Sequence, residues 1–196
     1  MKIETELKYI RSSWKFVLIV TGVFIFSLIA GSLVSLKNLG LPENYLEILK
    51  NSFGWIKSFS PIEIMLIIFL NNAVKSLLSM VLGTGLGIIP IIFIGGNGII
   101  VGLIVNEVLK EEGIVYVLAA LLPHGIIEVP MVLISAGLGL RLGYSMYISM
   151  RGEKKDMRYE LTESLHVFMK IIMPLLFVAA MIETFVTPLV VLMVLP

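Results

Sequence analysis

Five long apolar runs dominate the pattern of hydrophobic and polar positions along the chain. Each is close to the roughly 20 residues that an α-helix needs to cross the hydrocarbon core of a bilayer. The runs cover residues 16–36, 62–82, 86–106, 114–140 and 171–195. The pattern predicts an all-α, polytopic transmembrane helix bundle of about five spans, and we expect residues 1–196 to form a single integral membrane domain.

The connections between the middle runs are short. Only Gly83, Thr84 and Gly85 separate the second run from the third, and a brief charged stretch ending at Gly113 separates the third from the fourth. We therefore expect two tight turns. The fourth run is longer than a span requires, so it either breaks at Pro123 or Pro130 or forms one kinked helix, which we prefer.

Two stretches outside these runs have the apolar spacing of amphipathic helices. Residues 42–59 place aromatic and aliphatic side chains on one face, which predicts a helix in the outer membrane interface. Residues 157–168 alternate an apolar face with a charged one, which predicts a cytoplasmic extension of the last helix. Such an extension offers a docking surface for other membrane proteins, although a solvated connector is the commoner role.

Composition agrees with a membrane protein. Hydrophobic residues make up 58% of the chain, charged residues 15%, and the mean hydropathy is +1.00, which excludes an ordinary soluble domain. A net charge of +1 without a basic patch gives no support for nucleic-acid binding. The chain has no cysteine, so disulfides and thiol chemistry are excluded.

Orientation follows from the lysine and arginine residues between the runs. They are concentrated before the first run and between residues 141 and 170, two segments that five spans place on the same side. By the positive-inside rule this side is the cytoplasm, so we expect a multi-pass cell-membrane protein with a cytoplasmic N-terminus. The first run is too long for a signal-peptide core, and we interpret it as a retained anchor.

Polar residues near the middle of the runs mark a candidate site. Ionisable groups at that depth cost roughly 2.5–3.5 kcal/mol each and are expected to face one another inside the bundle. His124, Glu128 and Glu183 form the proposed centre. The surrounding polar cluster consists of Asn71, Asn72, Lys75 and Asn97.

The spacing of His124 and Glu128 places both side chains on one helix face, about 6 Å apart along the axis. With Glu183 they could bind a divalent transition metal, because a histidine with carboxylates suits Zn or Mn. The zincin motif is absent, since Glu128 stands where its second histidine would be. His166 lies roughly 25 Å from Glu183 along a continuous helix, so we do not expect it in the site.

Three interpretations of this cluster remain open. The first is that the polar side chains hold the helices in register by interhelical hydrogen bonds. The second is a metal-dependent hydrolase in which Glu128 activates water, and the third is a carrier of cations or protons. A carrier with five spans and no internal repeat would need to dimerise, and we expect a homo-oligomer.

Several motifs resemble the stage II sporulation protein M family. The similarity extends from about the second run to the C-terminus, and its most specific part is the block from Pro123 to Pro130. The other matching segments are Asn71-Asn72, Gly96-Asn97-Gly98, 137–143 and 179–188. The resemblance implies a prokaryotic cell-membrane protein, most simply a non-catalytic scaffold or assembly factor, since the sporulation member is a scaffold for peptidoglycan-remodelling proteins.

Overall fold

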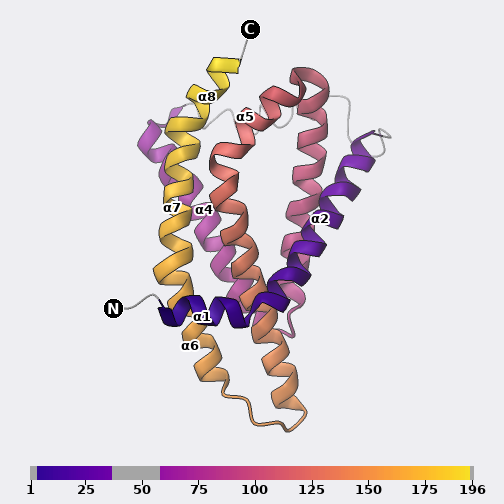
Figure 1. Ribbon diagram of the computed structural model, residues 1–196, viewed down its shortest axis with the longest axis vertical. Helices are drawn as coiled ribbons and strands as arrows, with labels where there is room; N and C mark the ends of the chain where they lie inside the picture. The colour runs from indigo at the N-terminus through magenta and orange to yellow at the C-terminus, as the bar shows by residue number, and fades with distance from the viewer. Residues whose placement is uncertain (1–3, 37–57, 195–196) are drawn as a thin grey trace.

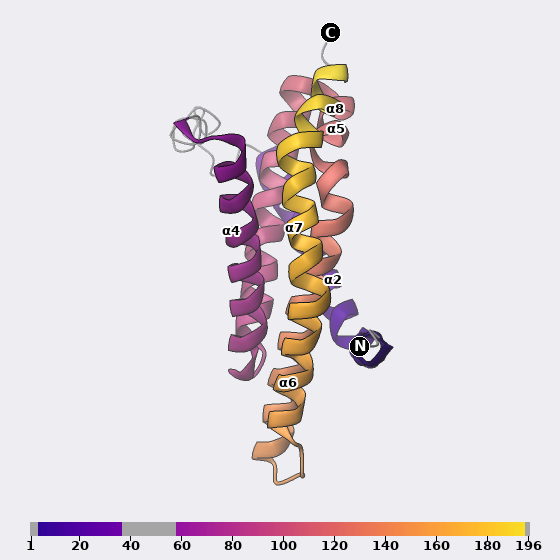
Figure 2. The same cartoon turned by 90° about the vertical axis from the view of Figure 1, so that its left-hand side faces the viewer.

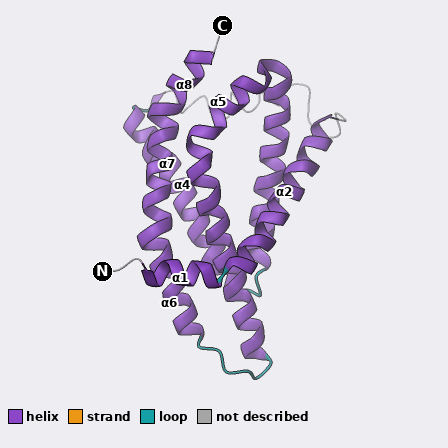
Figure 3. Ribbon diagram, in the orientation of Figure 1, coloured by secondary structure: helices purple, strands orange, loops and turns teal. Residues whose placement is uncertain are grey.

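The computed structural model describes residues 4–36 and 58–194, and these residues form helices joined by short turns, with no strand among them (Figure 3). The expected all-α helix bundle is therefore confirmed. The predicted interfacial helix at 42–59 falls almost entirely outside the described residues.

Four helical stretches are long and apolar enough to cross a membrane, at 14–36, 61–84, 88–150 and 157–194. They coincide closely with the apolar runs of the sequence. The elements are α1 (Glu4–Ser12), α2 (Trp14–Leu36), α4 (Pro61–Val81), η2 (Leu82–Thr84), α5 (Ile88–Met150), α6 (Met157–Val167), η3 (Phe168–Ile172), α7 (Met173–Met181), η4 (Ile182–Val186) and α8 (Thr187–Val194).

Helix α5 folds back on itself at Gly113, as Figure 1 shows at the end of the bundle opposite α1. Gly113 has φ 82° and ψ 172°, a conformation that a residue with a Cβ rarely adopts. The two arms, residues 88–112 and 114–150, correspond to the third and fourth apolar runs. Pro123 and Pro130 both lie inside the second arm, so the preferred single helix is the one observed.

Elements α6 to α8 form one continuous helix from Met157 to Val194, which includes the expected extension beyond the last apolar run. It contains two widened π-helical turns, η3 and η4. The turn η3 ends two residues before Pro174, and η4 ends two residues before Pro188. A proline supplies no N–H and leaves a carbonyl without its helical partner, and a local π adjustment is one way in which a membrane helix accommodates this.

The second arm of α5 is the central element of the bundle. Leu138 and Leu142 are fully buried in a core with α1, α4 and α6–α7. Leu133 and Ala136 lie in a second core with Val20 of α2 and the first arm. Residues 133–142 of the second arm therefore contribute to two cores that are formed with different helices.

Glycines let the helix backbones approach closely. A Cβ atom on Gly102 would lie 2.1 Å from the Leu28 carbonyl oxygen, and one on Gly98 would lie 2.8 Å from that of Phe24. The small-residue pair Gly98 and Gly102 is thus a contact with α2. On the second arm, Gly143 packs equally closely against Gly87, because a Cβ atom on Gly143 would lie 2.1 Å from the Gly87 backbone nitrogen.

A buried polar network joins α1, α5 and α6 at the N-terminal end of the bundle. The Glu160 carboxylate accepts hydrogen bonds from Tyr9 Oη at 2.7 Å, Arg141 Nε at 2.8 Å and Lys155 Nζ at 3.1 Å. Lys170 forms an ion pair with buried Glu6 beside it. These contacts hold α1 across the bundle, with α6 and the end of α5 projecting beyond it (Figures 1 and 2). Burial opposes ionisation of Glu160, but the bonds from its partners outweigh burial and lower the pKa of this carboxyl.

The packing of α2 predicts that Gly102→Ala destabilises the protein by roughly 1–3 kcal/mol, because the methyl group collides with backbone rather than with a mobile side chain. Gly96→Ala on the same arm is the matched control. Nothing lies within 4 Å of its hypothetical Cβ, so the helix should gain about 0.5–1 kcal/mol. Thermal unfolding in detergent measures both, and an equal effect of the two substitutions would contradict this packing.

The Glu160 network predicts that Glu160→Gln lowers stability by about 3 kcal/mol at neutral pH, because Arg141 keeps its charge and loses its buried partner. The carboxyl has a lowered pKa, so its contribution is fully present above the ordinary value of 4.5 and is lost as the pH falls through the lowered one. The variant should therefore unfold with a weaker dependence on acid pH than the parent. Glu153→Gln, on the exposed turn nearby, should leave both the stability and its pH dependence unchanged.

Candidate metal centre

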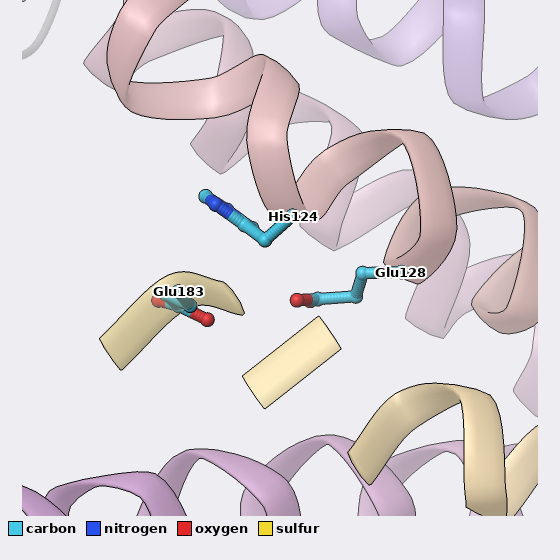
Figure 4. A group of neighbouring side chains, drawn as sticks. All are labelled: His124, Glu128 and Glu183. Carbon is cyan, nitrogen blue, oxygen red and sulfur yellow. The ribbon is translucent and has the colours of Figure 1, made fainter. Parts of the chain in front are cut away.

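The structure brings His124, Glu128 and Glu183 into one group, although 55 residues of sequence separate Glu128 from Glu183. One ligand atom from each side chain can be chosen so that all three lie within 4.8 Å of one another. All three residues are partly buried. Figure 4 shows His124 and Glu128 extending from the same helix towards Glu183.

Local helix geometry positions each of these side chains. His124 and Glu128 are four residues apart on the second arm of α5, so they leave the same face of the helix. Glu183 lies within the π-helical turn η4, where one extra residue per turn changes the direction in which the side chain leaves. Such turns are frequent at functional sites.

Thr187 also lies beside this group, next to the imidazole ring of His124. Its Oγ1 lies 3.4 Å from His124 Nδ1, and the residue is buried. A partner on Nδ1 helps to fix the orientation of an imidazole ring, which leaves the other ring nitrogen, Nε2, to face a ligand. Thr187 follows Glu183 by four residues, so helical spacing from Glu183 was the sequence signal that would have found it.

The donor set fits a divalent transition metal. Metal–ligand bonds of about 2.0–2.2 Å place the ligand atoms of one ion within roughly 4.4 Å of one another, so the present separations need only small side-chain movements. One imidazole and two carboxylates resemble the three-ligand sets of metal sites that leave a coordination position open. Metal binding itself stays a prediction.

The predicted polar cluster meets this group at Glu128. Asn71, Asn72, Lys75 and Asn97 line, together with Glu128, one cavity of about 120 Å³ between α2, α4 and the two arms of α5. Ser76 also lines it and was not singled out in the sequence, although it follows Asn72 by four residues. The remaining lining residues are apolar: Phe24, Phe93, Ile94, Val101, Val129, Val132 and Leu133.

Comparison with known proteins places these residues in a family. The family model described as stage II sporulation protein M matches residues 16–188. The chain belongs to the stage II sporulation protein M family. An uncharacterised protein of Methanocaldococcus jannaschii is 32% identical over 124 residues, which are 61% of this chain and 68% of the relative. No solved structure matches.

The family match includes the whole candidate centre and the polar cavity. It therefore agrees with the resemblance carried by the block from Pro123 to Pro130. In this member of the stage II sporulation protein M family, His166 lies outside the centre, as expected from its spacing. Its Nδ1 is 3.8 Å from Glu163 on α6.

Lys75 does not neutralise the carboxylates directly. It is exposed at the edge of the cavity, and among the described residues no ion pair joins it to Glu128 or Glu183. Among residues 4–36 and 58–194, no lysine or arginine forms an ion pair with either of these two neighbouring carboxylates.

Contact between α5 and the last helix predicts that a double variant, His124→Cys with Thr187→Cys, forms a disulfide in membranes under mild oxidation. The parent chain has no cysteine, so every crosslink is assignable. The control pair His124→Cys with Phe185→Cys should not crosslink, because Phe185 is exposed at nearly the same depth on another face. Gel mobility with and without reductant measures the result, and crosslinking of the control pair alone would contradict the arrangement.

Proposed function

We propose that this chain is a multi-pass cell-membrane protein with five spans and a cytoplasmic N-terminus. The reversal of α5 at Gly113 gives two arms, each with an apolar run of spanning length, and this supports five spans rather than four. Basic residues from two separate parts of the sequence come together at the α1 end, because α1, which carries Lys8 and Arg11, packs against α6 of the 141–170 segment. The positive-inside rule assigns such an end to the cytoplasm.

Within this framework we propose a non-catalytic scaffold or assembly factor whose helix bundle binds a divalent transition metal at His124, Glu128 and Glu183. The observation that carries the proposal is the convergence of these three ligands from two helices within 4.8 Å. A metal ion there would compensate two neighbouring carboxylates and join the second arm of α5 to the last helix. The family identity supports a scaffold role in the membrane.

A hydrolytic role has less support. Both carboxylates of the group would be metal ligands, so neither is free to act as a general base. A structural or transported ion fits this set of residues better than a catalytic one.

A second candidate function is a cation carrier, which the polar cavity beside Glu128 favours. Five spans alone offer few ways to alternate access, so a carrier would act as the homo-oligomer expected from the sequence, most simply a dimer. The scaffold and the carrier share the same metal centre. Both are tested first by asking whether that centre binds metal.

The metal centre predicts that adding Zn²⁺ or Mn²⁺ to metal-free protein raises its thermal unfolding temperature. At a hundredfold excess over Kd, binding to the folded state alone adds about 2.7 kcal/mol. Glu128→Gln and His124→Ala should each remove most of this response, because each takes away a ligand of one ion. Glu112→Gln, at an exposed carboxylate, should keep it.

If neither Zn²⁺ nor Mn²⁺ changes the unfolding temperature of the parent protein, the proposed metal centre is wrong. The proposal of a scaffold would then remain, without a bound metal. In that case Glu128→Gln should be mild, because interhelical hydrogen bonds in membranes average about 0.6 kcal/mol and glutamine retains the ability to make them. A metal response that survives in both variants would place the ion elsewhere.

A further inference from the structure

The cavity next to Glu128 has the chemistry of a hydrated chamber. Its volume of about 120 Å³ is several times what one water molecule requires. Amide, hydroxyl, ammonium and carboxylate groups line it alongside apolar side chains, so a water molecule inside would find the two to four polar partners that it needs. An entirely dry cavity would leave these groups facing empty space.

Ser76 gives independent evidence for an occupant. The residue is 0% exposed and lines the cavity, yet its Oγ has no hydrogen-bond partner among residues 4–36 and 58–194. A buried hydroxyl without a partner costs about 1–3 kcal/mol, so such groups are normally satisfied by protein or by water. Ser76 therefore has an unmet hydrogen bond at the wall of the cavity, which a water molecule inside would satisfy.

The asparagines leave acceptor atoms available there. Asn97 Nδ2 donates to the Phe93 carbonyl oxygen at 2.7 Å, which uses one of its two N–H groups and leaves the side-chain oxygen for another partner. Asn72 Oδ1 accepts from Asn71 Nδ2 at 3.3 Å and has a second lone pair. Amide, hydroxyl and carboxylate oxygens are the groups that replace water around a hard or borderline divalent cation.

Glu128 belongs to both the cavity and the metal group. We infer that the cavity is filled with water in the membrane and is the route by which a hydrated divalent cation reaches Glu128 from the α4 side. The cation part of this inference rests on the proposed metal centre, whereas the hydration of the cavity does not. Lys75 lines the cavity and is exposed, so its positive charge opposes the entry of a cation.

Single cysteines test the hydration directly, because the chain has none of its own. Thiol reagents react with the thiolate, which forms readily only in contact with water. Ser76→Cys in proteoliposomes should therefore react with a small charged methanethiosulfonate reagent, present on both faces, about tenfold faster than Ser79→Cys. Ser79 is the matched control, since it is 1% exposed on the same helix, its Oγ also lacks a partner, and it does not line the cavity.

A second substitution tests whether the polar walls are responsible. Asn97→Leu, added to the Ser76→Cys variant, replaces an amide by an apolar group and should slow labelling at position 76 severalfold. The same substitution should leave the slow labelling of Ser79→Cys unchanged. Gel filtration and the unfolding temperature identify any variant that has not folded. Equal, slow labelling of Ser76→Cys and Ser79→Cys in folded protein overturns the inference, whether or not metal stabilises the protein.

Saturating Zn²⁺ separates water access from cation access. If the ion enters by this route and settles at Glu128, it should slow labelling of Ser76→Cys at least threefold, and Glu128→Gln should abolish that protection. Rapid labelling that Zn²⁺ never slows, in a protein that Zn²⁺ does stabilise, overturns the cation route. Rapid labelling in a protein with no metal response retains the hydrated cavity and rejects the metal centre.

Discussion

Polar groups that lie within apolar surroundings must find partners inside the protein, and this constraint organises the bundle. Hydrocarbon offers no hydrogen bonds, so each unpaired group costs several kcal/mol. The second arm of α5 carries the most demanding groups, His124 and Glu128, and it occupies the centre of the bundle. Its position allows the last helix to bring Glu183, α4 to bring Asn71 and Asn72, and the first arm to bring Asn97 to the same region.

Prolines and π-helical turns contribute to the same organisation. Pro188 would interrupt a regular helix just beyond Glu183, and the chain responds with the widened turn η4 rather than a break. The carboxylate thus lies on a locally altered stretch of helix while the helix as a whole continues to Val194. The site is built on the irregular part of an otherwise regular element, where side-chain direction departs from simple helical periodicity.

Close packing away from the site makes this arrangement possible. Backbone contacts at Gly98 and Gly102 hold the first arm of α5 against α2, and those at Gly143 hold the second arm against the turn before the first. At the α1 end, Glu160 gathers Tyr9, Arg141 and Lys155 and ties three elements together. The C-terminal part of the central arm is thereby fixed at Arg141 and Gly143, while the first arm is fixed against α2.

The sequence by itself determined the elements and the candidate residues. Apolar length predicts the helices, the glycines near 83 and at 113 predict the turns, and the spacing of His124 and Glu128 predicts that they share a face, because these are local properties of a helix. It also led to the family through the block from Pro123 to Pro130. Helical spacing from Glu183 and Asn72 carried a signal for Thr187 and Ser76 as well, although a threonine or serine alone is too common to stand out.

Only the tertiary structure decided that Glu183 approaches Glu128 and that the asparagines border a cavity. It alone revealed the network around Glu160, whose members Tyr9 and Glu160 are 151 residues apart. Such contacts depend on how helices are rotated and paired, which follows from the packing of the whole bundle rather than from any one segment.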